Sequence, residues 1–403
     1  MHDEISGVFR QESARIVAAL VRYSGNLELA EDALQDAFVV ATEVWARDGV
    51  PANPGGWIMT TARRRLLDRV RRDTVLDDKV ALVARLQELP GDPADTEDDR
   101  LGLIFMCAHP ALALDARVAL TLRVVAGVST AEIAAAFLVP EATMAQRISR
   151  AKRKVVVAHI PFRQPEPEEF AGRLTAVLAV AYLLYNRGFD DSAELGGDGR
   201  RLGVEAARLV RLLDTLVPND PEIIGLTALM LLHDARRAAR IRDGERVLLD
   251  EQARAYWDPD KLAQGLTLVA RAPRLGAVGQ YWLQAAIVAE HMTPPSADRR
   301  DWSRICMLYD RLVTQSRGSV VVQLNRAIAV SMRDGPAAGL ALLEPLGDRL
   351  ASYVYFHAAR ADCLARLGDP EAADTYRRAI NLAERPGQRR SLQRALDKLE
   401  VSG

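Results

Sequence analysis

The stretch STAEIAAAFLVPEATMAQRISRAKRK, residues 129–154, contains the most informative local pattern of this chain. Ser129 with Glu132 three residues later matches a capping box, which predicts that a short apolar helix begins here. A tight turn at residues 137–139 follows. Pro140 fits the first turn of the next helix, where its missing N–H costs no hydrogen bond. The pattern therefore predicts a helix-turn-helix.

The second helix of this pair is strongly basic, with Glu141 as its one acidic residue. Met144, Ile148 and Ala151 recur at helical spacing and are expected to face inward. Polar side chains near the start of such a helix can read base edges in the major groove, and later basic residues hold phosphates. An unrelated amphipathic hairpin would produce a similar pattern. The predicted DNA-contacting residues are Thr143, Gln146, Arg147, Arg150, Lys152 and Lys154.

Apolar residues recur at three- and four-residue steps from Leu27 to Trp45, which predicts one long amphipathic helix. The opposite side is acidic and polar. It carries Glu28, Glu31, Asp32, Gln35, Asp36 and Glu43. A solvated face is the usual role of such charges, and a docking surface for a basic partner is the alternative. Periodicity alone leaves both interpretations open.

A Pro- and Gly-rich loop, DGVPANPGG (residues 48–56), then leads into WIMTTARRRLLDRVRR (residues 57–72). This second segment predicts a helix with six arginines and Asp68 as its one acid. Arginines beside an aromatic residue such as Trp57 suit phosphates and unstacked bases. A solvated arginine-rich face and a core tryptophan explain the same residues equally simply.

Composition limits the class of protein. A chain of 403 residues predicts two or three domains. Its richness in Ala, Leu and Arg, without long alternating β-branched runs, favours helices. The formal net charge is −1, and residues 1–160 hold 20 Lys+Arg against 22 Asp+Glu. Any affinity for DNA must therefore come from local patches.

Three scattered cysteines do not form a disulfide framework and suit a reducing cytoplasm. Cys107 and His109 form a Cys-x-His pair, but no second pair with zinc-ligand spacing lies near it, so no metal site is expected. The N-terminus has no apolar signal region, and no 18-residue apolar run occurs. We therefore expect a cytoplasmic protein with no membrane contact and no cofactor.

Taken together, AEDALQDAFVVA (residues 30–41), NPGGWIMTTARRRLLDRVRR (residues 53–72) and the helix-turn-helix closely resemble bacterial RNA polymerase sigma factors of the extracytoplasmic-function group. The resemblance covers roughly the first 160 residues. Between the two blocks, ELPGDPADTEDD (residues 88–99) is acidic and rich in Pro and Gly, as an exposed linker would be. One position departs from the family, which usually has Gly in the turn where this chain has Leu138.

The resemblance implies roles for particular residues. The acidic face with Glu31, Asp32, Gln35 and Asp36 would dock on the clamp helices of the polymerase β′ subunit. The helix-turn-helix would read the −35 element, and its domain would contact the β flap. The family flips a non-template base of the −10 element into a protein pocket, which costs a few kcal/mol of unstacking. The residues implied in binding and melting that element are Asn53, Trp57, Arg63, Arg64, Arg65, Arg69 and Arg72.

Such sigma factors normally end soon after the helix-turn-helix, but here the chain continues to residue 403, beginning with the Pro/Glu segment RQPEPEEF (residues 163–170). A shift of 34 residues aligns Arg326 with Arg360, Ala327 with Ala361 and further small and large residues after them. This is the period of tetratricopeptide (TPR) repeats. Residues 302–313 fit the second helix of a third copy.

Three further segments, at residues 181–189, 229–240 and 248–258, resemble the C-terminal extension of one subgroup of these sigma factors. The resemblance to that subgroup also implies a partner, a small DGPF/YCII-type protein. The extension is expected to regulate the sigma factor in cis. His233, Asp234 and the arginines after them invite an enzymatic interpretation, but no Ser/His/Asp order, phosphate loop or metal spacing supports one.

The sequence thus predicts an all-α chain with no catalytic residues. The predicted parts are a sigma-2 domain (residues 1–75), an acidic linker (76–107), a sigma-4 helix-turn-helix domain (108–160) and a helical TPR-like regulatory domain (161–403). Two other hypotheses stay open. One is an operator-binding regulator with a TPR-type interaction domain. The other is a scaffold whose N-terminal half is degenerate, which the intact arginine-rich patches argue against.

Overall fold

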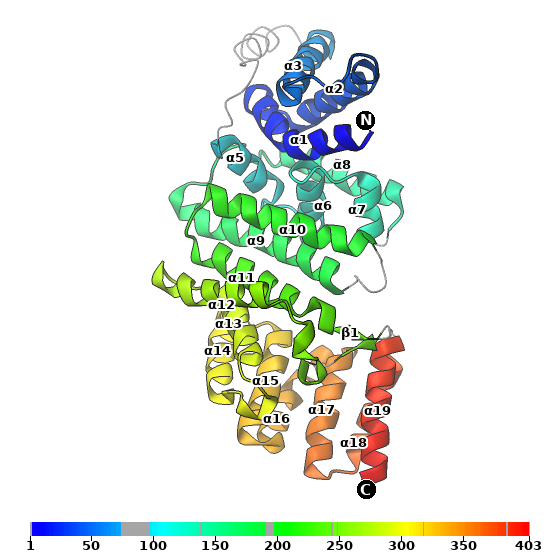
Figure 1. Ribbon diagram of the computed structural model, residues 1–403, viewed down its shortest axis with the longest axis vertical. Coiled ribbons are helices and arrows are strands. Elements are labelled where there is room, and N and C mark those ends of the chain that lie inside the picture. The colour runs from blue at the N-terminus through cyan, green and yellow to red at the C-terminus, as the bar shows by residue number, and fades with distance from the viewer. Residues whose placement is uncertain are drawn as a thin grey trace. The chain divides into compact units, whose positions relative to one another are not determined.

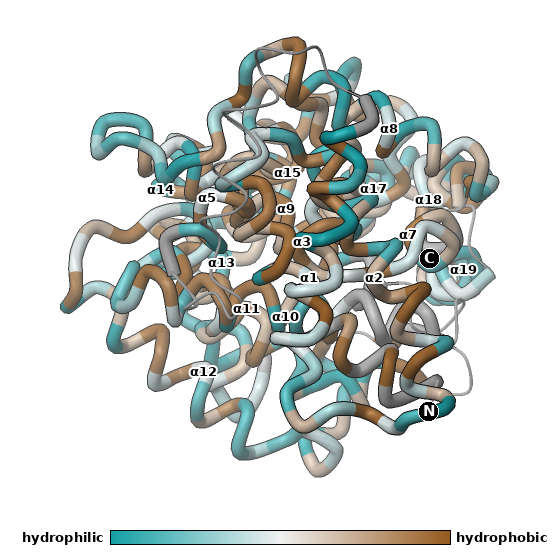
Figure 2. The backbone as a smooth tube through the Cα atoms, turned by 90° about the horizontal axis from the view of Figure 1, so that it is seen from above, coloured by the Kyte–Doolittle hydropathy of each residue, from teal (hydrophilic) through white to brown (hydrophobic). Residues whose placement is uncertain are grey.

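The computed structural model describes residues 2–73, 97–137, 139–190, 197–242, 245–247, 249–316, 318–383 and 386–402. Its internal contacts divide the chain into two compact units, Met1–Leu216 and Val217–Gly403 (Figure 1). Apart from one pair of two-residue strands, the described elements are helices, so the predicted all-α class is confirmed. Along the helices of both units hydrophobic and hydrophilic residues alternate, as expected for amphipathic helices (Figure 2).

The first unit begins with a three-helix group. Its helices are α1 (His2–Ser24), α2 (Leu27–Asp48) and α3 (Pro54–Asp73). Asn26 caps α2, because its Oδ1 accepts the backbone N–H groups of Glu28 and Leu29 at 2.9 and 3.2 Å. The long helix predicted from Leu27 onward is confirmed. Fully buried alanines along its inner side, Ala30, Ala33, Ala37 and Ala41, let α1 and α3 approach closely.

The rest of the first unit surrounds the helix-turn-helix. Its helices are α5 (Glu97–Cys107), α6 (Leu114–Val124), α7 (Thr130–Ala136), α8 (Glu141–Val157), α9 (Pro167–Asp190) and α10 (Gly197–Leu216). The packing of α5 differs from the sequence expectation of an acidic linker over residues 76–107. Leu103 and Ile104 are fully buried, and α5 contacts α1 and α6. Residues 76–96 lie outside the described part of the chain.

Helices α9 and α10 lie side by side and belong by their contacts to the first unit (Figure 1). Helix α9 contacts α5 and α6, and α10 contacts α7. The rings of Phe105 in α5 and Phe170 in α9 meet edge to face, with centroids 5.6 Å apart. The contact boundary at Leu216 thus falls later in the chain than the predicted domain boundary at residue 160, which remains a prediction.

The second unit is a succession of helices. They are α11 (Pro221–Ala235), α12 (Pro259–Arg271), α13 (Gln280–Met292), α14 (Trp302–Gln315), α15 (Val320–Asp334), α16 (Pro336–Leu343), α17 (Val354–Leu367), α18 (Glu371–Leu382) and α19 (Pro386–Ser402). The strands β1 (Ile241–Arg242) and β2 (Glu245–Arg246) pair antiparallel. Short 3-10 turns occupy Arg237–Ala239, Leu249–Glu251, Arg254–Tyr256, Ala272–Arg274, Ala297–Arg299, Glu344–Leu346 and Asp348–Leu350.

The 34-residue period has a counterpart in the helix register. Helices α15 and α17 begin at Val320 and Val354, and α14 and α16 begin at Trp302 and Pro336. Ala327 and Ala361, which the shift aligns, are both fully buried. Small residues at equivalent points allow paired helices to pack closely.

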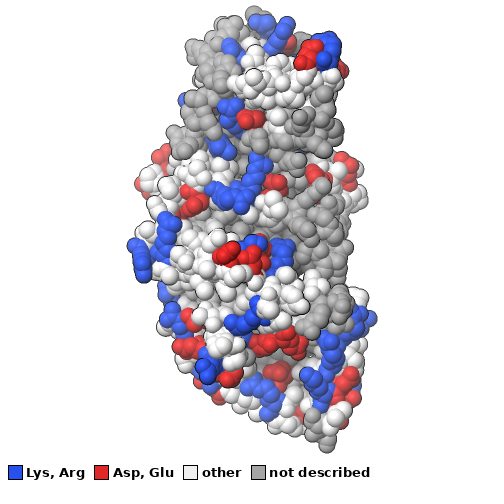
Figure 3. All heavy atoms as spheres, viewed as in Figure 1, with Lys and Arg blue, Asp and Glu red and all other residues white. Residues whose placement is uncertain are grey.

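Surface and composition features agree with a chain of mixed charge. Basic and acidic side chains are interspersed on the face shown in Figure 3. Cys107, Cys306 and Cys363 are buried and free. Among the helices that the structure describes, none combines the length and the apolar character that a membrane span needs.

Candidate nucleic-acid interface

The helix-turn-helix begins as its sequence predicts. The Ser129 Oγ accepts the Glu132 backbone N–H at 3.2 Å, and a Glu132 carboxylate oxygen accepts the Ser129 backbone N–H at 3.0 Å. This reciprocal pair is a capping box for α7. Pro140 stands one position before α8 and acts as its N-cap residue, so the helix proper begins at Glu141. Leu138, the departure in the turn, lies outside the described residues.

Helix α8 is the basic helix of the pair. Met144, Ile148, Ala151 and Val155 form its buried side. Among the predicted DNA-contacting residues, Thr143, Gln146, Arg150 and Lys154 are exposed. Helix α8 therefore presents hydroxyl, amide and cationic groups to solvent at these four positions.

Two predicted DNA-contacting residues of α8 are engaged within the protein. Arg147 lies over the Phe137 ring, 5.8 Å from its centroid, and its Nη1 is 3.7 Å from an Asp115 carboxylate oxygen. Lys152 is mostly buried, with 15% of its side chain exposed, and its Nζ lies 2.8 Å from Oε2 of Glu31. Glu31 Oε2 has no hydrogen-bond partner among the described residues, so this contact is an ion pair.

Helix α3 and the loop before it hold the second basic group. The Asn53 Oδ1 accepts the Gly56 backbone N–H at 2.9 Å, so this side chain caps the first turn of α3. The half-buried Trp57 packs edge to face on the buried Trp45, with centroids 5.4 Å apart. Trp57 therefore contributes to the core of this group of helices, while part of its surface stays accessible.

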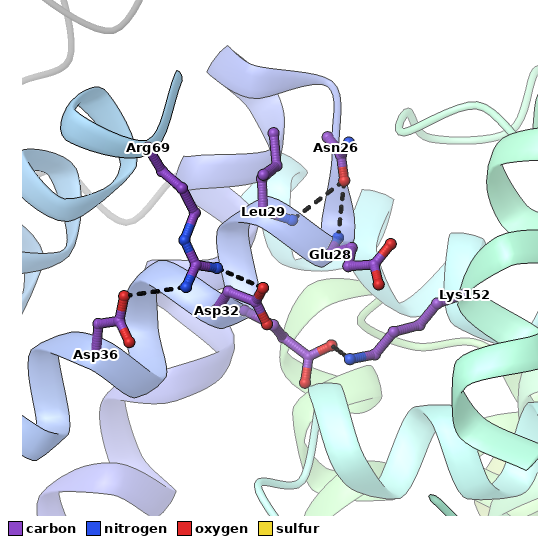
Figure 4. A network of polar contacts seen from close by, with 8 residues as sticks. Asn26, Glu28, Leu29, Asp32, Asp36, Arg69 and Lys152 are labelled. Atoms are coloured by element: carbon purple, nitrogen blue, oxygen red, sulfur yellow. Dashed lines mark hydrogen bonds and ion pairs between the residues drawn. The ribbon is translucent and has the colours of Figure 1, made fainter. Parts of the chain in front are cut away.

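The arginines of α3 differ in environment. Arg64 and Arg65 are exposed, and Arg63 is half-buried. Arg69 pairs with both Asp32 and Asp36 of α2, the latter at 3.3 Å (Figure 4). The Arg72 side chain lies outside the described residues. The structure thus brings one residue of the predicted −10 group together with two residues of the predicted polymerase-binding face.

The acidic face of α2 is less uniform than its sequence predicts. Gln35 is exposed, and Asp32 and Asp36 are half-buried beside Arg69. Glu31, expected on the exposed side, is buried with 4% of its surface accessible. This placement corrects the sequence prediction. The helical period puts Glu31 at the border of the apolar stripe, and helices packed on that border cover it.

Arg123 of α6 is a residue of this region that sequence reasoning missed. Its Nε lies 3.7 Å from Oε1 of Glu31, and its Nη1 donates to the Val128 carbonyl oxygen at 3.4 Å. The available signal was an isolated cation between the apolar Leu122 and Val124, both of which are buried. A charge at such a position needs a partner in the folded protein.

The pKa of the buried Cys107 thiol depends on the charges of Glu31 and Lys152 near it. Burial raises its pKa far above the usual range, the negative charge of Glu31 raises it further, and Lys152 lowers it. The thiol is therefore protonated and inert at neutral pH. The pKa of His109 is lowered, mainly by burial. Within the described residues, no group of three or more His, Cys, Asp or Glu side chains is arranged to hold a metal ion.

Comparison with known families matches three stretches of the chain. Residues 8–75 match the model for sigma-70 region 2, and residues 103–155 match the model for sigma-70 region 4. Residues 173–273 match a family of unknown function, DUF6596. The first match covers most of α1 and all of α2 and α3, and the second covers α6, α7 and most of α8, in the order in which the two basic groups occur.

Two relatives have similar sequences. An uncharacterized protein of Rhizobium meliloti (strain 1021), R00370, is 41% identical over 394 residues, which cover 95% of this chain and 93% of that protein. A probable ECF RNA polymerase sigma factor, SigI of Mycobacterium tuberculosis, is 27% identical over 161 residues, 38% of this chain and 55% of SigI. No solved structure matches this chain significantly.

Proposed function

Because this chain belongs to the sigma-70 family, as an extracytoplasmic-function type with a C-terminal extension, we propose that it directs core RNA polymerase to a small set of promoters under control of that extension. Sigma factors are initiation factors rather than enzymes, and core polymerase and promoter DNA are their partners. The observation that carries the proposal is the succession of regions 2 and 4 in one chain, each with an exposed basic helix.

In the proposed division of roles, α8 reads the −35 element through Thr143, Gln146 and Arg150, and Lys154 holds a phosphate. Asn53, Trp57 and the arginines of α3 bind and melt the −10 element. The α2 residues Asp32, Gln35 and Asp36 dock on the β′ clamp helices. The region-4 helices contact the β flap.

The proposed regulation in cis has support in the first unit. Helices α9 and α10 follow region 4 in the chain and contact α5, α6 and α7. A change in α9 and α10 would therefore reach the helix-turn-helix directly. The 34-residue period of the second unit supports a TPR-like surface for a protein partner, and a small DGPF/YCII-type protein is the proposed candidate.

Transcription with purified core enzyme tests the sigma-factor proposal. Added protein should yield promoter-specific transcripts from a cognate genomic fragment, and the absence of such transcripts from every fragment would refute the idea. Footprinting without core enzyme is the companion assay. Strong site-specific protection by the protein alone would favour an operator-binding regulator instead.

Two truncated chains test regulation in cis. A chain that ends at Leu216 lacks the second unit, and a chain that ends at Phe162 also lacks α9 and α10. At least one should differ from the full chain in the amount of transcript or in promoter choice. Full-length activity and promoter choice in both truncated chains would remove the regulatory role. Co-expression and co-purification with the DGPF/YCII-type protein tests that partner separately.

A further inference from the structure

Glu31 connects the two sigma regions of the first unit. It belongs to α2 in region 2, whereas its cationic partners Arg123 and Lys152 belong to α6 and α8 in region 4. Its carboxylate is buried, and the two cationic side chains are 17% and 15% exposed. Figure 4 shows Lys152 reaching across from α8 toward α2. Removing one partner of such a buried pair leaves an uncompensated charge, which costs far more than breaking an exposed surface pair.

Further contacts join α1 of region 2 to α5 and to the turn before the helix-turn-helix of region 4. Arg22 at the end of α1 pairs with Asp99 of α5 at 3.2 Å. Gly127, in the turn before the helix-turn-helix, lies against Ser13 and Phe9 of α1 so closely that an added Cβ would be 3.1–3.2 Å from their side chains. The ion pair therefore belongs to a continuous contact between the regions rather than to an isolated touch.

This contact is incompatible with simultaneous recognition of both promoter elements. The −10 and −35 elements are, by their positions, about 25 base pairs apart, or about 85 Å along B-form DNA. Helix α8 has 17 residues and α3 has 20, which are about 25 and 30 Å long. Regions joined through an ion pair of 2.8 Å cannot reach elements that far apart.

We propose that Glu31, Arg123 and Lys152 form an autoinhibitory lock that holds the basic helix of region 4 against region 2 in the free protein. The lock engages Glu31 of the predicted polymerase-binding face and Lys152 of the predicted DNA-binding group at the same time. Binding to core polymerase and promoter therefore competes with closure. The regulatory meaning of the lock rests on the proposed function, but the contact itself does not.

Hydrogen exchange of the full chain tests the contact. In Glu31→Gln, backbone amides at the end of α8 and the start of α2 should exchange at least tenfold faster than in the wild type, while α15–α18 stay unchanged. Glu28→Gln is the matched control, because it makes the same charge change at an exposed position of the same helix. Arg123→Gln should act in the same direction and provides a second route if Glu31→Gln fails to fold.

DNA binding without polymerase tests the inhibition. The probe is a labelled duplex from a genomic fragment that is transcribed in the assay above. Glu31→Gln should bind it at least tenfold more tightly than Glu28→Gln, which has the same net charge. Unchanged exchange at α2 and α8 would overturn the lock. Faster exchange with equal DNA affinity would reduce it to a structural ion pair and overturn the inhibition.

The exchange measurement also separates this proposal from the proposed function. If no genomic fragment is ever transcribed, the sigma-factor assignment of activity fails, yet exchange in Glu31→Gln still decides whether the contact exists. If transcripts appear and exchange in Glu31→Gln equals that in Glu28→Gln, the lock fails and the sigma factor stands.

Discussion

Gly25 and Gly127 have the same backbone angle but differ in how closely other residues pack around them. Gly25 and Gly127 both have φ of +66°, where an alanine is strained by about 1 kcal/mol. Nothing lies within 4 Å of a Cβ at Gly25, whereas a Cβ at Gly127 would press on Ser13 and Phe9. We predict that Gly127→Ala lowers the free energy of unfolding by about 1 kcal/mol more than Gly25→Ala does.

Urea unfolding of the two variants, compared with the wild type, measures this difference. Strain alone is common to both substitutions, so the excess isolates the contact between α1 and the turn before the helix-turn-helix. Equal losses of stability would mean that the turn does not pack on α1 in solution.

His291 makes the second unit sensitive to acid. Burial lowers its pKa to about 4, and the charge of Arg300 contributes in the same direction. Between about pH 6.5 and 4 the unfolded chain therefore binds a proton that the folded chain does not. Stability falls as the pH falls through this window. The expected loss between pH 7 and 4.5 is about 2 kcal/mol.

Urea unfolding at the two pH values, followed by tryptophan fluorescence, checks the prediction. His291→Asn should have a smaller loss between pH 7 and 4.5 than the wild type. His159→Asn replaces an exposed histidine whose φ of +47° asparagine tolerates, so it is the matched control. The same pH dependence in all three proteins would contradict the assignment to His291.

At the scale of single residues, local rules predicted what depends on near neighbours in sequence. The capping box of Ser129 and Glu132 is confirmed because both of its hydrogen bonds lie within four residues. Glu31 was misplaced because its burial depends on α6 and α8, about 90 and 120 residues further on. A helical period places a residue on a face but does not say which other helix covers that face.

Among the secondary-structure elements, α8 carries the sharpest functional prediction. Arg150 is exposed on the basic helix, and Ser149 beside it is exposed and uncharged. If Arg150 contacts the −35 element, Arg150→Ala should weaken promoter binding by about 1–3 kcal/mol, roughly five- to 150-fold. Ser149→Ala should leave binding within twofold.

Fluorescence anisotropy of polymerase holoenzyme on matched and −35-mutated promoter duplexes measures both variants. Loss of affinity on the matched duplex alone identifies base recognition by Arg150. Equal weakening on both duplexes assigns the residue to a phosphate. Wild-type affinity of Arg150→Ala on both would remove it from the interface.

The predicted elements were most accurate where a pattern was long and regular. The α2 stripe predicted a long helix from Leu27, where α2 begins, and helix starts in the second unit recur at the 34-residue shift read from the sequence. The acidic composition of residues 88–99 concealed the beginning of α5 at Glu97. Negative charges in the first turn of a helix are favourable, so acidic residues alone do not identify a linker.

At the scale of the whole molecule, the predicted end of the sigma part at residue 160 and the contact boundary at Leu216 differ by two helices. The sequence break is the Pro/Glu segment near residue 163, which is a local signal. The contact boundary depends on the long-range packing of α9 and α10 on α5, α6 and α7. Local composition carries no information about that packing.

The stability of two truncated chains tests whether α9 and α10 fold cooperatively with the helices before them. The chain that ends at Leu216 keeps the Phe105–Phe170 contact and the buried side of α9. The chain that ends at Phe162 loses both. Since each large apolar side chain that becomes exposed costs about 1.5–3 kcal/mol, we predict that the shorter chain is less stable to urea by more than about 3 kcal/mol. Equal stability of the two would place α9 and α10 outside the cooperative unit, because helices that contribute to a shared core cannot be removed without a loss of stability.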